Sequence, residues 1–286
     1  QRATQPRPPK TLLFSAEKQP DGLKDFYRGS PAFLLCSGPS LATHNLMRLT
    51  ERGILTMAVN NAAVADQVRK CMLRVNLWTC VDGPGSFCEQ IWLDPGILKF
   101  AHFGHLDARI AVGTQDGRIE TIGKTVRECP AVLYYLRRDD FWPETFLYST
   151  EIAAGNPDNW ADPLDNKGAR SVMLVAIRLL FHLGVRTIYL LGCDFRMEHG
   201  GRNYAFDQWR SDKAVDSNNR KYDVLNDRLA ALLPYFKKEG LQIVNCTPDS
   251  GLRVFPFVEY EKAVAAVRDG FPQWVVTEGR YERKKK

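Results

Sequence analysis

The segment at residues 171–195, SVMLVAIRLLFHLGVRTIYLLGCDF, decides the fold class. Its first half has apolar side chains at helical spacing, namely Val172, Leu174, Val175, Leu179 and Phe181. Gly184 follows as the expected C-cap of this helix. The second half, TIYLLGCDF, is an apolar run of the kind that a parallel sheet buries on both faces. A buried helix followed directly by a buried strand predicts an α/β protein.

The same alternation continues toward the N-terminus. Strands are predicted at AFLLCS (32–37), ILTMAVN (54–60) and VNLWTCVD (75–82). A helix is predicted from Ser40 to about Arg52, and a shorter one at residues 62–69.

Toward the C-terminus, the sequence predicts a polar loop from Arg196 to Asn219 and a helix from about Tyr222 to Glu239. The strand LQIVNCT (241–247) and a last helix near residues 259–268 follow. This rhythm predicts one Rossmann-like domain at residues 29–271, with a mostly parallel sheet and helices on both faces.

Three parts of the chain lie outside this rhythm. Residues 103–165 mix short apolar pieces with turn residues and are predicted to form a small lid or insertion. Residues 1–28 are rich in Pro, Lys and Gln and predict a flexible arm, and residues 272–286 predict a basic tail.

Composition limits the class of protein. Hydrophobic residues make up 44% of the 286 residues, which is enough for a sizeable core. No run reaches the roughly 18–20 apolar residues that span a bilayer, and the N-terminal residues have no apolar signal-like core. The seven cysteines are scattered and odd in number, which favours free thiols over a metal site. We therefore expect a soluble cytoplasmic protein with no membrane partner.

The formal net charge of +6 lies partly in the two ends of the chain. Such tails favour a polyanionic partner such as nucleic acid, although solvated tails explain the same charge.

Polar residues close the first predicted strand. An open parallel sheet binds ligands at the carboxyl ends of its strands. Ser37, Gly38, Pro39 and Ser40 form a turn into a helix, where free N–H groups and a close backbone approach suit a phosphate. The alternative is that Ser37 or Ser40 only caps the helix.

The next two predicted strands also end on polar groups. Asn60 and Asn61 are candidates to hydrogen-bond a base or a ribose, although paired asparagines are also common turn formers. Asp82 follows the third strand beside two glycines, where a carboxylate suits a ribose hydroxyl, a metal or a proton.

Two later segments add candidates. Arg170 and Ser171 precede the buried helix and suit a phosphate, with a capping turn as the alternative. Asp194 closes the apolar strand, and the polar loop behind it carries His199, Tyr204, Phe206 and Asp207 among other residues. Aromatic residues in such a loop suit stacking on a base or sugar, or they cover the edge of the core.

These motifs resemble a known family. GPSL after the first strand, IYLLGCDF followed by YAFD, and NCTPDS together resemble the bacterial sialyltransferases that use CMP-sialic acid, and the related MAF-like family. The resemblance covers roughly residues 30–60 and 165–265.

The resemblance implies a donor site. The nucleotide would lie over Ser37–Ser40 and Asn60, and Tyr204 would stabilise the leaving phosphate. The remaining donor-site residues that the resemblance implies are Ser171, Cys193, Phe195 and Phe206. Tyrosine hydroxyls and helix dipoles stabilise such a phosphate without a metal, so no metal is predicted.

One departure from the family concerns the general base. The family uses a histidine downstream of the YAFD motif, whereas no histidine follows His199 in this chain. The candidates for a catalytic role are therefore Asp194, His199, Asp207 and Asp216, in a region that also carries Asp212, Tyr222 and Asp223.

The sequence thus predicts a glycosyltransferase that uses a CMP- or UDP-sugar. Its acceptor alternatives are a saccharide, a protein side chain and a hydroxymethylated base in DNA. Two other functions stay open: a Mg²⁺-dependent pterin-type diphosphokinase with Asp82 and Asp194 as metal ligands, and a non-catalytic nucleotide- or nucleic-acid-binding module.

Overall fold

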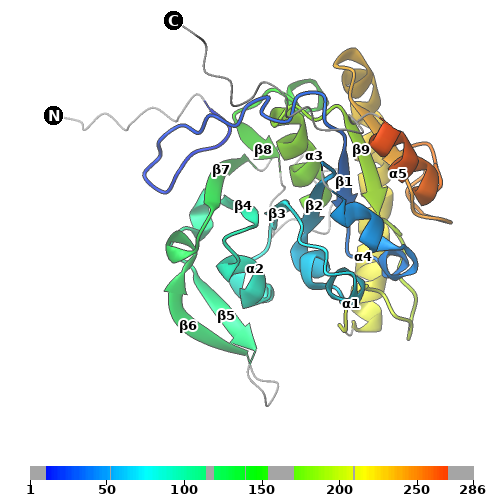
Figure 1. Cartoon of the computed structure of the whole chain (residues 1–286). Coiled ribbons are helices and arrows are strands. Elements are labelled where there is room, and N and C mark those ends of the chain that lie inside the picture. The colour runs from blue at the N-terminus through cyan, green and yellow to red at the C-terminus, as the bar shows by residue number, and fades with distance from the viewer. Residues whose placement is uncertain are drawn as a thin grey trace, which may run out of the picture.

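The computed structural model describes residues 11–51, 53–113, 119–138, 140–153, 171–208 and 210–269. Its main sheet has the strand order β10-β9-β1-β2-β3-β4-β7-β8 (Figure 1). The strands are β1 (Ala32–Leu35), β2 (Leu55–Val59), β3 (Leu77–Thr79), β4 (Leu98–His102), β7 (Val132–Arg138), β8 (Glu151–Ala153), β9 (Thr187–Leu191) and β10 (Gln242–Asn245). Every neighbouring pair is parallel, which confirms the predicted Rossmann-like α/β fold.

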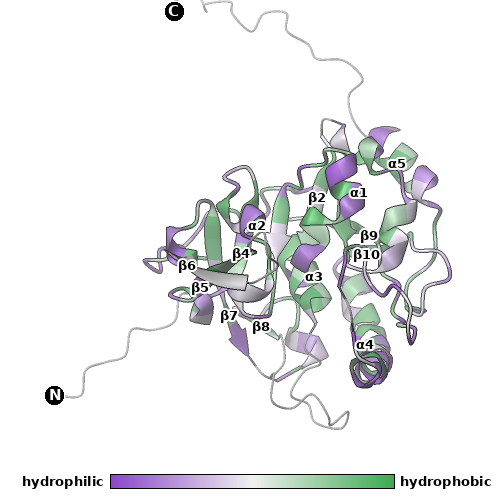
Figure 2. Ribbon diagram, turned by 90° about the horizontal axis from the view of Figure 1, so that it is seen from below, coloured by the Kyte–Doolittle hydropathy of each residue, from purple (hydrophilic) through white to green (hydrophobic). Residues whose placement is uncertain are grey.

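Two helical layers cover this sheet. The α-helices are α1 (Asp66–Lys70), α2 (Glu89–Leu93), α3 (Val172–His182), α4 (Asp212–Lys238) and α5 (Tyr260–Asp269). Short 3-10 helices connect them: η1 (Pro39–Thr43), η2 (Leu46–Thr50), η3 (Asn60–Val64), η4 (Pro84–Ser86), η5 (Phe103–His105), η6 (Val126–Glu128) and η7 (Pro143–Thr145). Figure 2 shows α3 and α4 on one side of β9 and β10, and α1 and α5 on the other.

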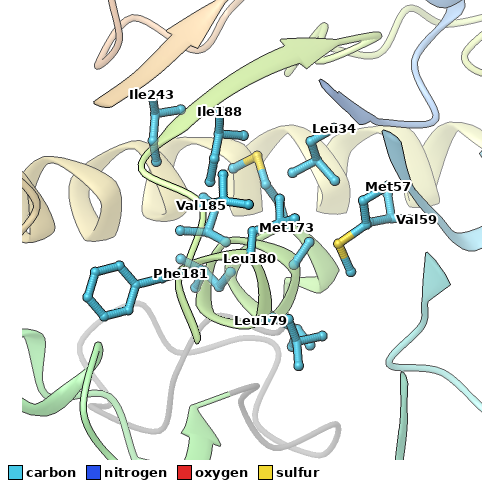
Figure 3. Close-up of a cluster of buried hydrophobic side chains, with 14 of the residues drawn as sticks. Leu34, Met57, Val59, Met173, Leu179, Leu180, Phe181, Val185, Ile188 and Ile243 are labelled. Carbon is cyan, nitrogen blue, oxygen red and sulfur yellow. The ribbon is translucent and has the colours of Figure 1, made fainter. Parts of the chain in front are cut away.

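The alternation of side chains along each strand explains these layers. In β1, Leu34 belongs to the cluster that includes α3 and α4, whereas Phe33 and Leu35 belong to the cluster that includes α1, α2 and α5. Figure 3 shows the first cluster, where Leu34 and Ile188 from the sheet lie beside the side chains of α3. Because both faces are covered, the strands have the continuous apolar runs that the sequence shows.

The strand order reverses between β1 and β9. β1 pairs with β2 on one side and with β9 on the other, so the chain leaves β1 in one direction and returns much later on the opposite side. Open α/β sheets bind ligands at the carboxyl ends of the strands that flank such a switch point.

The start of α4 corrects one prediction. Residues 212–219 were predicted to belong to a polar loop, but the helix begins at Asp212, where the Ser211 side chain accepts a hydrogen bond from the Ala214 N–H. Val215 is the only residue buried in the first three turns, so this part of the helix has no apolar period to reveal it.

The helix predicted from Ser40 to about Arg52 is also different. This segment forms the two 3-10 helices η1 and η2, separated by His44 in an extended conformation.

The predicted lid or insertion at residues 103–165 divides into two parts where the structure describes it. β7 and β8 extend the main sheet, while β5 (Arg109–Gly113) and β6 (Ile119–Thr125) form a separate antiparallel pair (Figure 1). Residues 154–165 lie outside the described residues, as does the predicted basic tail.

The predicted N-terminal arm is wrong for residues 11–28. Leu12, Leu13 and Phe14 are buried, and the backbone of Phe14 exchanges two hydrogen bonds with Tyr134 in β7, of 3.0 and 2.8 Å. Tyr27 donates its N–H to Leu183 at the end of α3. Residues 1–10 lie outside the described part of the chain.

Within the described residues, no helix is both long enough and apolar enough to cross a membrane.

Candidate functional site

A cavity of about 130 Å³ lies at the switch point. The predicted site residues that line it are Ser37, Gly38, Asn60, Ser171, Cys193, Asp194 and Phe195. Cys36, Val59, Val172, Met173, Gly192, Arg196, Asn203, Tyr222 and Leu225 complete its walls. Pockets that enclose a whole drug-sized ligand measure about 300–1,000 Å³, so this cavity suits one part of a larger ligand.

Asp194 forms one wall of the cavity and holds the GPSL turn in place. Its Oδ2 accepts a hydrogen bond of 2.8 Å from the Ser40 hydroxyl, and the Ser40 N–H lies 3.3 Å from Oδ1. A side chain at Gly38 would overlap Asp194 Oδ2 and would lie 2.6 Å from the Gly192 carbonyl oxygen. The absence of a side chain at Gly38 thus allows the Asp194 carboxylate to reach the start of η1.

This contact changes the prediction for Ser37–Ser40. The positive end of η1 was predicted to hold a phosphate or to be capped by a serine, but the Asp194 carboxylate occupies it. A phosphate at the same place would be repelled by this charge. Burial raises the pKa of the Asp194 carboxyl, against the opposing effects of the Ser40 bonds and the charge of Arg196.

Asn60 has the most unusual environment in the cavity. Its φ is 53°, in the left-handed region, and the indole N–H of Trp78 donates a 2.7 Å hydrogen bond to its carbonyl oxygen. The side-chain Oδ1 is buried and has no hydrogen-bond partner. A buried acceptor without a partner costs about 1–3 kcal/mol, so this oxygen is a strong candidate to meet a donor on a ligand.

Asn61 and Asp82 were predicted beside Asn60 but do not line the cavity. The Asn61 amide is used inside the fold: it donates to the Ser86 carbonyl at 3.2 Å and accepts from the Cys88 N–H at 3.1 Å. Asp82 follows β3, two strands away from β1 in the sheet. Asp194 and Asp82 therefore do not share the cavity, as the metal site of a diphosphokinase would require.

The opposite wall comes from the start of α3. The Ser171 hydroxyl accepts a 3.2 Å hydrogen bond from the Met173 N–H, so it caps the helix as the alternative interpretation held. Arg170 lies outside the described residues. Cys193 donates its N–H to Thr247, and its thiol, together with that of Cys36, lies buried on the cavity floor.

Phe195 and Tyr222 close one end of the cavity. Their rings stack with centroids 4.9 Å apart, and Phe195 has a φ of 52°. Burial raises the pKa of the Tyr222 hydroxyl, so this group keeps its proton and remains a hydrogen-bond donor at neutral pH. Among the described residues that line the cavity, Arg196 is the only one with a cationic side chain, and it is exposed.

The aromatic residues of the next loop do not line the cavity. The Tyr204 ring stacks on Phe206 at 5.2 Å, and its hydroxyl accepts a 2.9 Å hydrogen bond from Arg210. Asp207 in the same loop is exposed. The loop as the structure describes it therefore places an aromatic pair and a guanidinium beyond the described cavity wall.

His199 is held between two carboxylates of α4. Its Nδ1 lies 3.0 Å from Asp212, and its Nε2 lies 3.0 Å from Asp216, one helical turn further on. The hydrogen bond to Asp212 is the main reason that the pKa of His199 is raised. Both ring nitrogens lie within hydrogen-bond distance of a carboxylate, so in this arrangement the imidazole fastens the loop to α4.

Among the lining residues that the sequence pattern did not assign to the site, Arg196, Asn203 and Tyr222 have charged or strongly polar side chains. Tyr222 was placed at the start of its helix, whereas it lies three turns inside α4. Arg196 directly follows the CDF motif, and this position could have identified it as a site residue. The Asn203 amide bonds only to the backbone of Glu198 and Gly201, so it shapes the loop, and no sequence pattern marks that role.

Within the described ranges, no group of three or more His, Cys, Asp or Glu side chains has the geometry to hold a metal ion.

The fold is Rossmann-like, with a cavity at its switch point. No protein-family model matches the chain, and no curated protein matches it significantly. Among solved structures it is similar to the MAf glycosyltransferase from Magnetospirillum magneticum AMB-1, with a TM-score of 0.45 and 15% identity over 92% of this chain. This chain covers 40% of the length of that protein.

It is also similar to the sialyltransferase CstII from Campylobacter jejuni in complex with the substrate analogue CMP-3FNeuAc. That match has a TM-score of 0.42 and 15% identity, over 80% of this chain and 86% of the other. A mammalian sialyltransferase matches with a TM-score of 0.37 and 13% identity, over 70% and 66% of the two chains. Proteins of the kinds that the sequence motifs resemble are therefore among the structural matches. Similarity this distant carries no argument about activity, which rests on the cavity.

Proposed function

We propose that the chain is a nucleotide-sugar-dependent glycosyltransferase and that the cavity binds the nucleoside part of the donor. The observation that carries the proposal is the unpartnered, buried Oδ1 of Asn60 in the same cavity as the Asp194 carboxylate. Both are acceptors, so they select a ligand rich in donors, such as the hydroxyls of a ribose or the amino group of a base.

The phosphate of the donor lies toward Arg196. This guanidinium lines the cavity and is exposed, so it neutralises charge that develops on a departing phosphate. The protonated hydroxyl of Tyr222, another lining residue, is a second donor. The Tyr204 hydroxyl accepts from Arg210 and can also donate, so it is a third donor for a sugar that reaches this loop.

The reaction transfers the sugar in one displacement. The acceptor oxygen forms a bond to the anomeric carbon while the bond from that carbon to the phosphate oxygen breaks, and the phosphate oxygen keeps the electron pair. The nucleotide leaves as an anion, which is the charge that Arg196 and the tyrosine hydroxyls stabilise.

A nucleotide panel tests this function. Thermal shift and calorimetry with CMP, UDP, GDP, ADP and ATP, each with and without Mg²⁺, should show tightest binding to CMP or UDP. Incubation with CMP-sialic acid or UDP-glucose should then show slow hydrolysis of one donor. Binding of ATP alone, dependent on Mg²⁺, would instead support a diphosphokinase, and nucleotide binding with no hydrolysis of either donor would support a non-catalytic binding module.

A further inference from the structure

A second hollow of about 650 Å³ lies beside the cavity, between α4 and the turn after β10. It shares Phe195 and Arg196 with the cavity, so the two spaces meet at these residues. We call this hollow the α4 groove.

Hydrogen bonds fix both walls of the α4 groove. The Asn226 amide donates to the Gly251 carbonyl at 3.1 Å and accepts from the Arg253 N–H at 3.2 Å. Asn219 holds the Met197 backbone in the same two-sided way, and the Ser250 hydroxyl bonds to the Cys193 carbonyl. The groove is therefore a built feature that ties α4 to both neighbouring loops.

The groups left to meet a ligand are charged. Asp223 and Asp227 lie one turn apart on α4 and are exposed, and Asp249 faces the same space from the opposite turn. Arg196 and Arg253 are the cations in the lining.

We propose that the α4 groove receives the acceptor of the transfer and that Asp223 takes the proton from the attacking hydroxyl. This inference rests on the function proposed above. Tyr222 and Leu225 line the cavity and Asp223, between them in the sequence, lines the groove, so the turn of α4 that carries Asp223 borders both spaces. As the acceptor oxygen bonds to the anomeric carbon, its proton passes to Asp223, and the nucleotide phosphate leaves.

The histidines offer no competing base. Both nitrogens of His199 are held by carboxylates. The other four, His44, His102, His105 and His182, do not line the cavity or the groove. A carboxylate therefore takes the place of an imidazole in this chain.

The charges of the groove also select the acceptor class. Three carboxylates face two guanidinium groups, so the phosphates of a nucleic acid would meet net repulsion, although the chain as a whole is basic. Sugar hydroxyls donate to the carboxylates and accept from the guanidinium groups. The groove thus fits an uncharged, hydroxyl-rich acceptor rather than DNA.

The test compares Asp223→Asn with Asp107→Asn, the same change at an exposed aspartate that lines neither the cavity nor the groove. In Asp223→Asn, CMP or UDP affinity should stay within about twofold, while kcat for donor hydrolysis should fall by about 100-fold or more. Water replaces the acceptor in this assay, so no saccharide is needed. Asp107→Asn should keep kcat for hydrolysis, and wild-type transfer should occur to lactose and not to a duplex with hydroxymethylated cytosine.

Three outcomes would overturn the inference. They are an unchanged kcat in Asp223→Asn, an equal loss in both variants, and transfer to the duplex in preference to lactose. A wild-type protein that binds no nucleotide contradicts the glycosyltransferase itself, and this result is separate because the calorimetry does not depend on Asp223.

Discussion

Asn60 has two features that each lower the stability of the fold. Its backbone is in the left-handed region, where asparagine is tolerated better than most residues, and its side-chain oxygen is buried without a partner. Neither feature helps the fold, since glycine would adopt the same backbone at no steric cost. Structures keep such features where a ligand uses them.

Asn60→Gly should therefore separate stability from binding. The melting temperature should stay the same or rise, because the unpaired acceptor is removed and glycine accepts a φ of 53°. Affinity for CMP or UDP should fall by about tenfold, which corresponds to the loss of one hydrogen bond of about 1.4 kcal/mol. Thermal melts and calorimetry measure the two effects.

Asn45→Ala is the control for this change, because Asn45 is exposed and its side chain makes no capping bond to η2. It should leave both quantities unchanged. Equal affinity in Asn60→Gly and the wild type would remove Asn60 from the ligand site.

A substitution at Gly38 should lower stability, in contrast to Asn60→Gly. Gly38→Ala places a Cβ against Asp194 Oδ2 and the Gly192 carbonyl, and the carbonyl belongs to backbone that cannot turn aside easily. We expect a loss of about 1–3 kcal/mol in the free energy of unfolding, measured by urea titration. Gly83→Ala is the matched control, because nothing lies within 4 Å of its Cβ position and its φ is −57°. A Gly38→Ala protein as stable as Gly83→Ala would show that the Asp194 contact is dispensable.

At the scale of the element, α4 is where the sequence-based prediction was weakest. The buried positions Leu225, Leu229, Leu232 and Phe236 follow a helical period, so the second half of the helix was predictable. The first turns are polar and exposed, and their helical state depends on the Ser211 cap and on tertiary contacts that no local pattern encodes. Because these turns were predicted as a loop, the four-residue helical spacing that places Asp212 and Asp216 on both sides of His199 was not recognised.

The His199 bridge to α4 should weaken at high pH. The folded-state pKa of His199 is raised, so its contribution is complete below the ordinary value of about 6.5 and is lost as the pH rises above the raised pKa. Amide hydrogen exchange in the loop at residues 196–208, corrected for intrinsic rates, should show more protection at pH 6 than at pH 9. His199→Gln should remove this difference.

The same variant tests the role of His199. It should retain donor hydrolysis within a few fold, because His199 lines neither the cavity nor the groove and both of its ring nitrogens lie beside carboxylates. A loss of 100-fold would make His199 the base and would contradict the assignment of Asp223.

At the scale of the whole molecule, the strands around the switch point were predictable, whereas β4, β7 and β8 were not. β1, β2 and β9 have side chains in both buried clusters, which the apolar composition of each run reveals. β7 is only partly buried and β8 has three residues, so neither shows a strand pattern, and both fall within the predicted lid or insertion. The cavity was predictable in outline because several of its residues directly follow strands that are neighbours in the sheet. Tyr222 and the α4 groove depend instead on how a helix distant in the sequence packs.

Two histidines should make the whole fold acid-sensitive. Burial, helped by nearby cations, lowers the pKa of His102 and of His182 to about 4. Their stabilising effect is complete above the ordinary value of about 6.5 and is lost as the pH falls toward 4, because the unfolded chain binds the protons first. With allowance for partial exposure, each should remove on the order of 1 kcal/mol from the free energy of unfolding between pH 7 and pH 4.5.

Urea titrations at these two pH values measure this loss, and the double variant His102→Gln, His182→Gln should show a smaller one. The same loss in the double variant as in the wild type would assign the acid sensitivity to other groups.

The hydrogen bonds between Ser40 and Asp194 join residues that are 154 positions apart. During synthesis at about 5–20 residues per second, the first wall of the cavity leaves the ribosome many seconds before the second. The edge of β1 that pairs with β9 then stays uncovered until β9 has been synthesised. Nascent chains halted before residue 187 should therefore expose an unpaired parallel strand edge, and chaperone binding at this stage would protect the site that the finished protein uses.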